Sequence, residues 1–169
     1  QRAALLGSLA EVRKDWVAAE LNYREVLALE KPGAAALRLP VVLMQQNRRQ
    51  YAYYELKSVK DNSDYSDEIR REAFRTEIKF NQILRVDDKL QNATYTRALA
   101  FWPEAHALRY QYAMHLFSQM QTESALKQLQ EIIKQAPANA DALNAYGYTV
   151  AKDLGRPKQG FRSIEKAFL

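Results

Sequence analysis

The sequence predicts an all-α protein built from about five antiparallel helix pairs. Its last third contains two similar copies of one repeat, 34 residues apart. Tyr112 in the first copy corresponds to Tyr146 in the second, and Pro103 corresponds to Pro137. A repeat of this length holds two helices and two turns but is too short to bury an apolar face alone. We therefore expect the helix pairs to stack on one another.

The first two repeats are marked by small residues. Gly7 and Ala19 have the spacing of two close helix contacts, and Trp16 opens the second helix of that repeat. Ala52 lies 33 residues after Ala19 and marks the next repeat. The five predicted repeats are residues 1–32, 33–62, 66–103, 104–137 and 138–169.

The first helix of the second repeat carries an irregularity. Pro40 falls where this helix should hold a small residue, and a proline there removes a backbone donor and clashes with the preceding turn. We expect the helix to be kinked, or to begin late with Pro40 in its first turn.

The third repeat departs from the period. Residues 61–67 are rich in Asn, Asp and Ser, which favour turns and helix caps, and the phase slips there by about five positions. Ser66 followed by Asp67 predicts a helix start, and an apolar stripe through Phe80 predicts a lengthened first helix. Gln91 stands where the second helix should have Ala, so we expect a degenerate repeat.

In the last two repeats, helices are predicted to begin at Glu104 and Asn139. Each pair has small residues where only Gly or Ala lets two helices approach closely. These residues are Ala113 and Ala125 in the fourth repeat, and Gly147 and Gly160 in the fifth.

These small residues, the closing pair Ile132 and Ile133, and Tyr95 upstream resemble the tetratricopeptide repeat (TPR) from about residue 95 to the end. The resemblance implies a right-handed superhelical solenoid, in which the first helix of each pair lines a concave groove that binds a protein or peptide. The groove positions that it implies are Leu37, Val41, Met44, Gln45, Tyr110, Met114, Phe117, Asn144, Tyr148 and Lys152.

This predicted groove is apolar and aromatic, which suits adaptable contact with another protein. A neighbouring helix or a part of the protein outside this chain could cover it instead. The family's clamp for C-terminal carboxylates needs Lys and Asn one turn apart, but Ala4 and Ser8, or Tyr110 and Met114, stand there. The sequence therefore argues against an adaptor for chaperone tails.

The search for chemistry predicts no catalytic residue, no metal site and no cofactor. His106 and His115 are nine residues apart, without the spacing of a zinc-protease helix, and there is no cysteine. No Gly-rich phosphate loop occurs. Asp87 and Asp88 stand at a predicted turn, where we expect them to cap a helix.

The net charge of +5 comes from scattered Lys and Arg. The basic groups at Arg48 and Arg49, at residues 70–79 and at residues 156–166 mostly have acidic neighbours at helical spacing. This pattern favours a solvated face over a nucleic-acid site. No apolar run approaches the roughly 20 residues of a membrane-spanning helix.

The segment of residues 140–151, followed by Leu154, Gly155 and Arg156, resembles TPR lipoproteins of the bacterial envelope, some of which scaffold a carboxy-terminal processing protease. That resemblance implies a periplasmic location, with an outer-membrane anchor outside this chain, and an envelope protease or its substrates as partner. Similar repeats also follow the zinc-metallopeptidase domain of periplasmic quality-control proteases. An HExxH sequence upstream would indicate such an enzyme's substrate-handling domain, and a lipobox cysteine would indicate the scaffold.

Both ends are expected to be cut in mid-repeat, since Gln1 already lies in a predicted first helix. The last helix is predicted to leave apolar residues without a polar cap. We expect either a next helix pair outside this chain or another copy of the protein, through end-to-end self-association, to cover them. These residues are Ile164, Ala167, Phe168 and Leu169.

Overall fold

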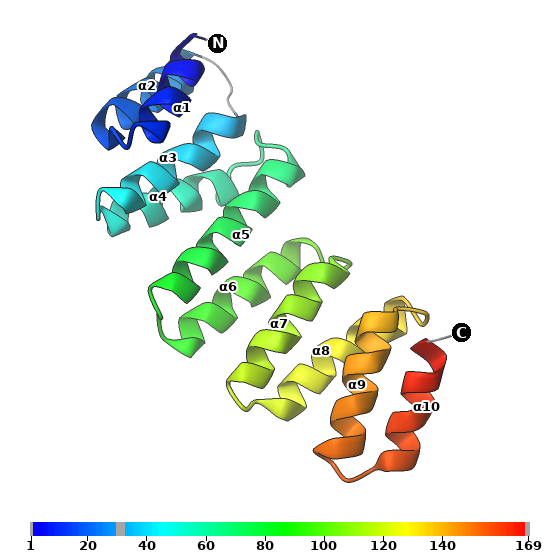
Figure 1. Ribbon diagram of the computed structural model, residues 1–169. Helices are drawn as coiled ribbons and strands as arrows, with labels where there is room; N and C mark the ends of the chain where they lie inside the picture. Colours follow the sequence, from blue (N-terminus) through cyan, green and yellow to red (C-terminus); the bar gives the residue numbers. More distant parts are fainter. Residues whose placement is uncertain (1, 30–32, 168–169) are drawn as a thin grey trace. The chain divides into compact units, whose positions relative to one another are not determined.

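The structure is a computed structural model that describes residues 2–29 and 33–167, and in these residues it has ten helices and no strand (Figure 1). The predicted all-α class of helix pairs is confirmed. Two helices lie in each predicted range: α1 (Arg2–Val12) and α2 (Trp16–Leu29), α3 (Gly33–Gln45) and α4 (Arg49–Asp61), α5 (Asp67–Ile83) and α6 (Asp88–Phe101), α7 (His106–Ser118) and α8 (Thr122–Gln135), α9 (Ala140–Lys152) and α10 (Pro157–Ala167).

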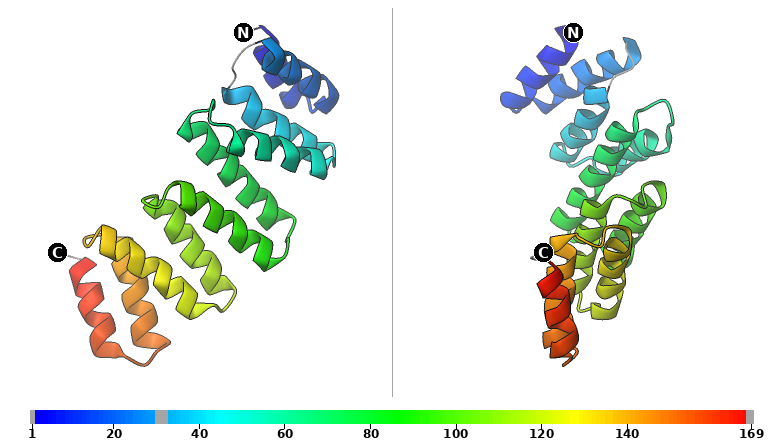
Figure 2. Two further views of the ribbon diagram at one scale, coloured as in Figure 1. Left: turned by 180° about the vertical axis from the view of Figure 1, so that it is seen from behind. Right: turned by 90° about the vertical axis from the view of Figure 1, so that its right-hand side faces the viewer.

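The helices form two compact units, which divide inside the predicted third repeat. The N-terminal unit is Gln1–Val86, with α1 to α5, and the C-terminal unit is Asp87–Leu169, with α6 to α10. In the N-terminal unit α5 packs on α3 and α4, and in the C-terminal unit α6 packs on α7. Figure 2 shows neighbouring helices side by side within each unit, for example α9 with α10.

The core of the N-terminal unit combines side chains from all five of its helices. Ala19 and Ala52 are fully buried, as the repeat pattern predicts for small residues at helix contacts. A Cβ atom at Gly7 would lie 2.8 Å from the ring of Tyr23, so glycine lets this ring cross α1. The Tyr23 hydroxyl then donates a hydrogen bond to Glu11 at 2.5 Å.

The C-terminal unit has a smaller apolar core between α7, α8 and α9. Its buried residues are Ala113, Leu129, Ile132 and Ala142. In the last pair, a Cβ atom at Gly147 would lie 2.6 Å from the carbonyl oxygen of Gly160, so α9 and α10 are in close backbone contact. The predicted roles of both glycines at a helix contact are confirmed.

In the described residues, side-chain caps fix four helix starts. Asp15 accepts from the Ala18 amide at 3.1 Å at the start of α2. Ser66 accepts from the Ile69 amide at 3.4 Å and starts α5, whose 17 residues confirm the predicted lengthened helix. Asp87 accepts from the Lys89 amide at 2.8 Å, as the turn assignment predicts. Asn139 accepts from the Ala142 amide at 2.9 Å and starts α9.

The prediction of a late start at Pro40 is wrong. Helix α3 begins at Gly33 and continues through Pro40, which is buried inside it. Ala35, Ala36 and Leu39 on the preceding turns are also buried in the core. Tertiary packing of an apolar face outweighs the backbone hydrogen bond that the proline removes.

The apolar surface of α10 also differs from the expectation. Ile164 and Ala167 are half-buried, and Ile164 packs against Gly147, whereas Phe161 is 61% exposed. Phe168 and Leu169 lie outside the described residues. Across the described ranges, no helix has the length and apolar character needed to cross a membrane.

Candidate functional site

A cleft of about 650 Å³ opens between α3 and α5, the first helices of two successive pairs, and lies wholly in the N-terminal unit. We refer to it as the α3/α5 cleft. Its apolar lining is Val41, Met44, Phe80, Ile83 and Leu84, and its polar lining is Arg38, Gln45, Asn47, Arg49, Glu72, Arg75, Thr76 and Lys79.

Three of the four groove residues predicted for the second repeat line this cleft. Val41 and Met44 are half-buried, with one side against the core, and Gln45 is exposed. Leu37 is half-buried and packs against the core, outside the residues that line the cleft. A role of these residues in binding stays a prediction.

Sequence reasoning missed the wall that α5 contributes. Arg75 and Lys79 were assigned to a solvated face, yet both line the cleft beside Thr76 and Ile83. Their spacing of three to four residues places them on one face of a helix. This face runs beside the apolar stripe that predicted α5. The helical spacing of Arg75 and Lys79 could therefore have indicated that both lie next to apolar surface.

The cleft is positively charged at its rim. Of its four basic residues, Arg75 pairs with Glu72 at 3.0 Å, and Arg38 forms an ion pair with Glu11. Arg49 and Lys79 are exposed, and no acidic side chain in the described parts of the chain lies within ion-pair distance of either.

Glu11 links the cleft to the first helix pair. Its partial burial opposes ionisation, but hydrogen bonds from Arg38 and Tyr23 outweigh that effect and lower the pKa of Glu11. Arg38 is thereby held at the edge of the cleft through its Nε, which donates to Glu11 at 2.9 Å.

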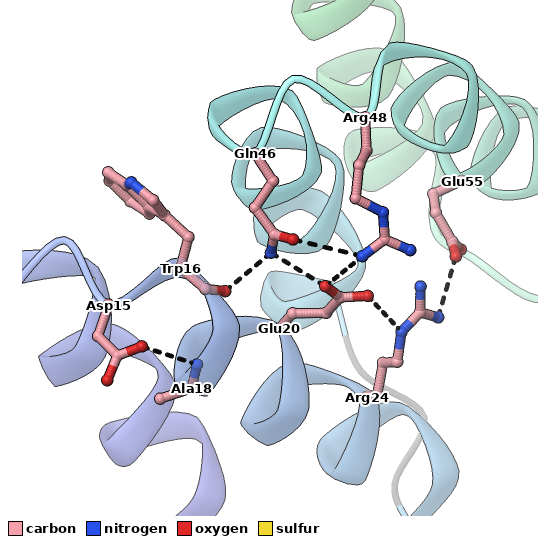
Figure 3. Close-up of polar contacts among 8 residues, drawn as sticks. All are labelled: Asp15, Trp16, Ala18, Glu20, Arg24, Gln46, Arg48 and Glu55. Carbon is pink, nitrogen blue, oxygen red and sulfur yellow. Dashed lines mark hydrogen bonds and ion pairs between the residues drawn. The ribbon is translucent and has the colours of Figure 1, made fainter.

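A polar network holds the α3–α4 turn beside the cleft (Figure 3). Glu20 on α2 accepts from Gln46 at 2.9 Å, from Arg48 at 2.6 Å and from Arg24 at 3.1 Å. Partial burial opposes ionisation of Glu20, but these three hydrogen bonds prevail and its pKa is lowered. The turn at Asn47, whose φ of 60° is left-handed, is thus fixed to the preceding helix pair.

The groove residues predicted for the C-terminal unit fall into two groups. Tyr110, Met114 and Phe117 on α7 are half-buried and pack against the core of this unit. Asn144, Tyr148 and Lys152 on α9 are exposed, and the Lys152 ammonium lies 5.3 Å from the centre of the Tyr148 ring. Binding by either group stays a prediction.

Both histidines take part in contacts within the C-terminal unit. His106 Nε2 lies 3.0 Å from Gln135 Oε1, and the His115 ring lies 5.4 Å from that of Tyr95. Burial lowers the pKa of His115. The described residues contain no group of three or more His, Cys, Asp or Glu side chains that could hold a metal ion.

No protein-family model matches the sequence, and no curated protein matches it. Solved structures do resemble it. MamA is 18% identical with a TM-score of 0.62, over 96% of this chain and 92% of that chain. YrrB, described as a TPR protein with an unusual peptide-binding site, is 19% identical with a TM-score of 0.56, over 95% and 80%. MamA 41-end from Desulfovibrio magneticus RS-1 is 12% identical with a TM-score of 0.56, over 98% and 91%. These likenesses show that the chain has the TPR fold.

Proposed function

We propose that this chain is a non-catalytic protein-interaction scaffold that holds a segment of another protein in the α3/α5 cleft. The observation that carries the proposal is the cleft itself, which lies between two first helices of the TPR fold. We call its apolar lining residues the apolar floor, namely Val41, Met44, Phe80, Ile83 and Leu84. The similarity to YrrB, a TPR protein with an unusual peptide-binding site, supports a peptide as the kind of ligand.

The floor of the cleft favours burial against a ligand. Ile83 is 67% exposed and Met44, which also lines the cleft, is half-buried, so apolar surface meets water inside a concave site. Such surface gains free energy when a partner covers it, and a flexible methionine adapts to different partner side chains. From Glu72 to Ile83, the α5 wall is about 16 Å long at 1.5 Å per helical residue, enough for two to three turns of a bound helix.

The test is selection of ligands from a random peptide library, followed by calorimetry on variants. Ile83→Gln should weaken binding of a selected peptide by about tenfold, since it removes exposed apolar contact area from the floor. The matched control is Leu21→Gln, because Leu21 is 71% exposed on α2 and does not line the cleft. Equal binding by both variants would place the peptide elsewhere and contradict the proposal.

The proposal extends to a location in the bacterial envelope, with a periplasmic protease or its substrates as partner. It is supported by the resemblance of residues 140–156 to envelope lipoproteins of this fold. Fractionation of the source cells should recover the full-length protein with the periplasm or the outer membrane, and recovery in the cytosol would contradict this location.

The alternative, a substrate-handling region of a zinc metallopeptidase, requires an HExxH sequence in the full-length gene.

A further inference from the structure

We propose that the segment held in the α3/α5 cleft is acidic and amphipathic. It would be two to three helical turns long, with apolar side chains on one side and Asp or Glu beside them. This inference rests on the proposed function and names the partner class of the same site.

Charge complementarity carries the inference. Four basic side chains and one glutamate line the cleft, and that glutamate is already paired with Arg75. Arg49 and Lys79 come from different helices and have no acidic partner among the described residues. Helix α4 begins at Arg49, so the partial positive charge of its amino end has the same sign. Carboxylates on the ligand would offset the positive charge that Arg49 and Lys79 bring to the cleft.

The apolar floor indicates a protein segment rather than a nucleic acid. Binding of single-stranded nucleic acid relies on exposed aromatic rings for base stacking. The aromatic residue of the cleft, Phe80, is only 6% exposed. Val41, Met44 and Ile83 would remain uncovered by phosphates, whereas leucine or isoleucine side chains of a peptide would cover them.

The experiment compares three designed helical peptides that share one leucine face and carry Glu, Gln or Lys on the adjoining face. Calorimetry with the full chain at low salt should show the Glu peptide binding at least about tenfold more tightly than the Gln peptide, and the Lys peptide binding most weakly. The preference for Glu should shrink as the salt concentration rises.

Two charge-neutralising variants locate the effect. Arg49→Gln with Lys79→Gln should remove most of the preference for the Glu peptide and leave the Gln peptide nearly unaffected. Arg156→Gln with Lys158→Gln makes the same change in net charge at exposed residues of the C-terminal unit, and it should keep the preference.

Three results would overturn the inference. One is equal binding of the Glu and Gln peptides, and another is a preference that Arg49→Gln with Lys79→Gln leaves unchanged. The third is displacement of the Glu peptide by an equal concentration of single-stranded oligonucleotide. If Glu and Gln peptides bind equally but Ile83→Gln weakens both, the acidic partner is wrong while the peptide cleft stands. If Ile83→Gln changes neither, both proposals fail.

Discussion

Two glycines set the distance between α9 and α10. A Cβ atom at Gly147 would lie 2.6 Å from the Gly160 carbonyl oxygen and 2.7 Å from Ile164 Cγ1, closer than non-bonded atoms approach. A Cβ atom at Gly160 would collide with the Gly147 carbonyl and with Ala151. Backbone atoms are among these neighbours, so the contact cannot be relieved by rotating one side chain.

Gly147→Leu should therefore lower the free energy of unfolding by roughly 2 to 4 kcal/mol, through overpacking and the separation of two helices. Denaturant unfolding followed by circular dichroism measures the change. Ala107→Leu adds a leucine at an exposed position of α7 and should cost little. An unchanged unfolding midpoint for Gly147→Leu would show that α9 and α10 are less closely packed than described.

A buried ion pair joins α4 to α5. The Lys60 ammonium pairs with the Glu77 carboxylate, and their side chains are only 2% and 9% exposed. The ammonium also lies 4.9 Å from the centre of the Phe74 ring. Removing one of two charges that are buried to this degree is costly, because the remaining charge loses an opposite charge at contact distance.

Lys60→Met should then cost about 3 to 5 kcal/mol of stability, since the buried Glu77 carboxylate loses its ion pair with the Lys60 ammonium. Adding Glu77→Leu to this variant should restore much of the loss, because an apolar pair of similar volume fits the same space. The free energies of unfolding of the two single variants and the double variant, each compared with the unmodified chain, form a double-mutant cycle that measures the coupling. Additive losses in the double variant would contradict a coupled pair.

At the scale of elements, carboxylates fasten the first helix pair to the second. Glu20 of α2 accepts from Gln46 and Arg48 in the turn after α3, and Arg24 of α2 also bonds Glu55 of α4 at 3.2 Å (Figure 3). Because the folded pKa of Glu20 is lowered below its ordinary value of 4.5, its contribution to stability is complete above that pH. It is lost as the pH falls through the folded pKa.

Glu20→Gln should lower the stability of the chain at neutral pH by about 1 kcal/mol, a small cost because Arg24 and Arg48 are 44% and 38% exposed. The difference from the unmodified chain should shrink as the pH drops below 4.5, where both chains approach a neutral side chain at this position. Thermal melting across the acid range tests the prediction. A difference that is constant with pH would mean that the charge of Glu20 contributes nothing.

Local chemistry made some elements predictable. Ser66 and Asp87 act on amides two or three residues away, so their caps could be read from the sequence. Gly147 was recognisable from its place in the period. The late start at Pro40 is wrong, because the burial of neighbouring turns of α3 outweighs a local rule, whereas the alternative of a kink stays a prediction.

The candidate site was less predictable than the helices. Val41 and Met44 follow from the repeat pattern, but the cleft also needs α5, whose position depends on packing against α3 and α4. The sequence shows that Arg75 and Lys79 share a helix face, but it does not show which surface that face meets. Pairing partners such as Glu11 for Arg38, 27 residues apart, come only from the folded chain.

At the scale of the whole molecule, the candidate site and the division of the chain are related. Every residue that lines the α3/α5 cleft lies before the boundary between Val86 and Asp87. The N-terminal unit also has its own apolar core, drawn from α1 to α5. The binding activity proposed for the chain should therefore belong to this unit alone.

A fragment of residues 1–86 should fold and bind the selected peptides with the affinity of the full chain, within about threefold. Circular dichroism should show a helical fragment with a cooperative melt, and calorimetry gives its affinity. The complementary fragment of residues 87–169 is the control and should not bind these peptides. A folded fragment 1–86 without affinity would show that residues beyond Val86 contribute to the site.

The Lys60 and Glu77 pair also bears on how a chain of look-alike hairpins avoids assembling in the wrong order. Successive helix pairs share their small residues and apolar stripes, so a hairpin could dock on a neighbour other than its own, which is a characteristic failure of repeat proteins. Any misdocking of α5 that still excluded water would strand an ammonium and a carboxylate apart from each other. The pair thus favours α4 as the neighbour of α5. We expect it to make wrongly docked arrangements less stable than the native one during folding.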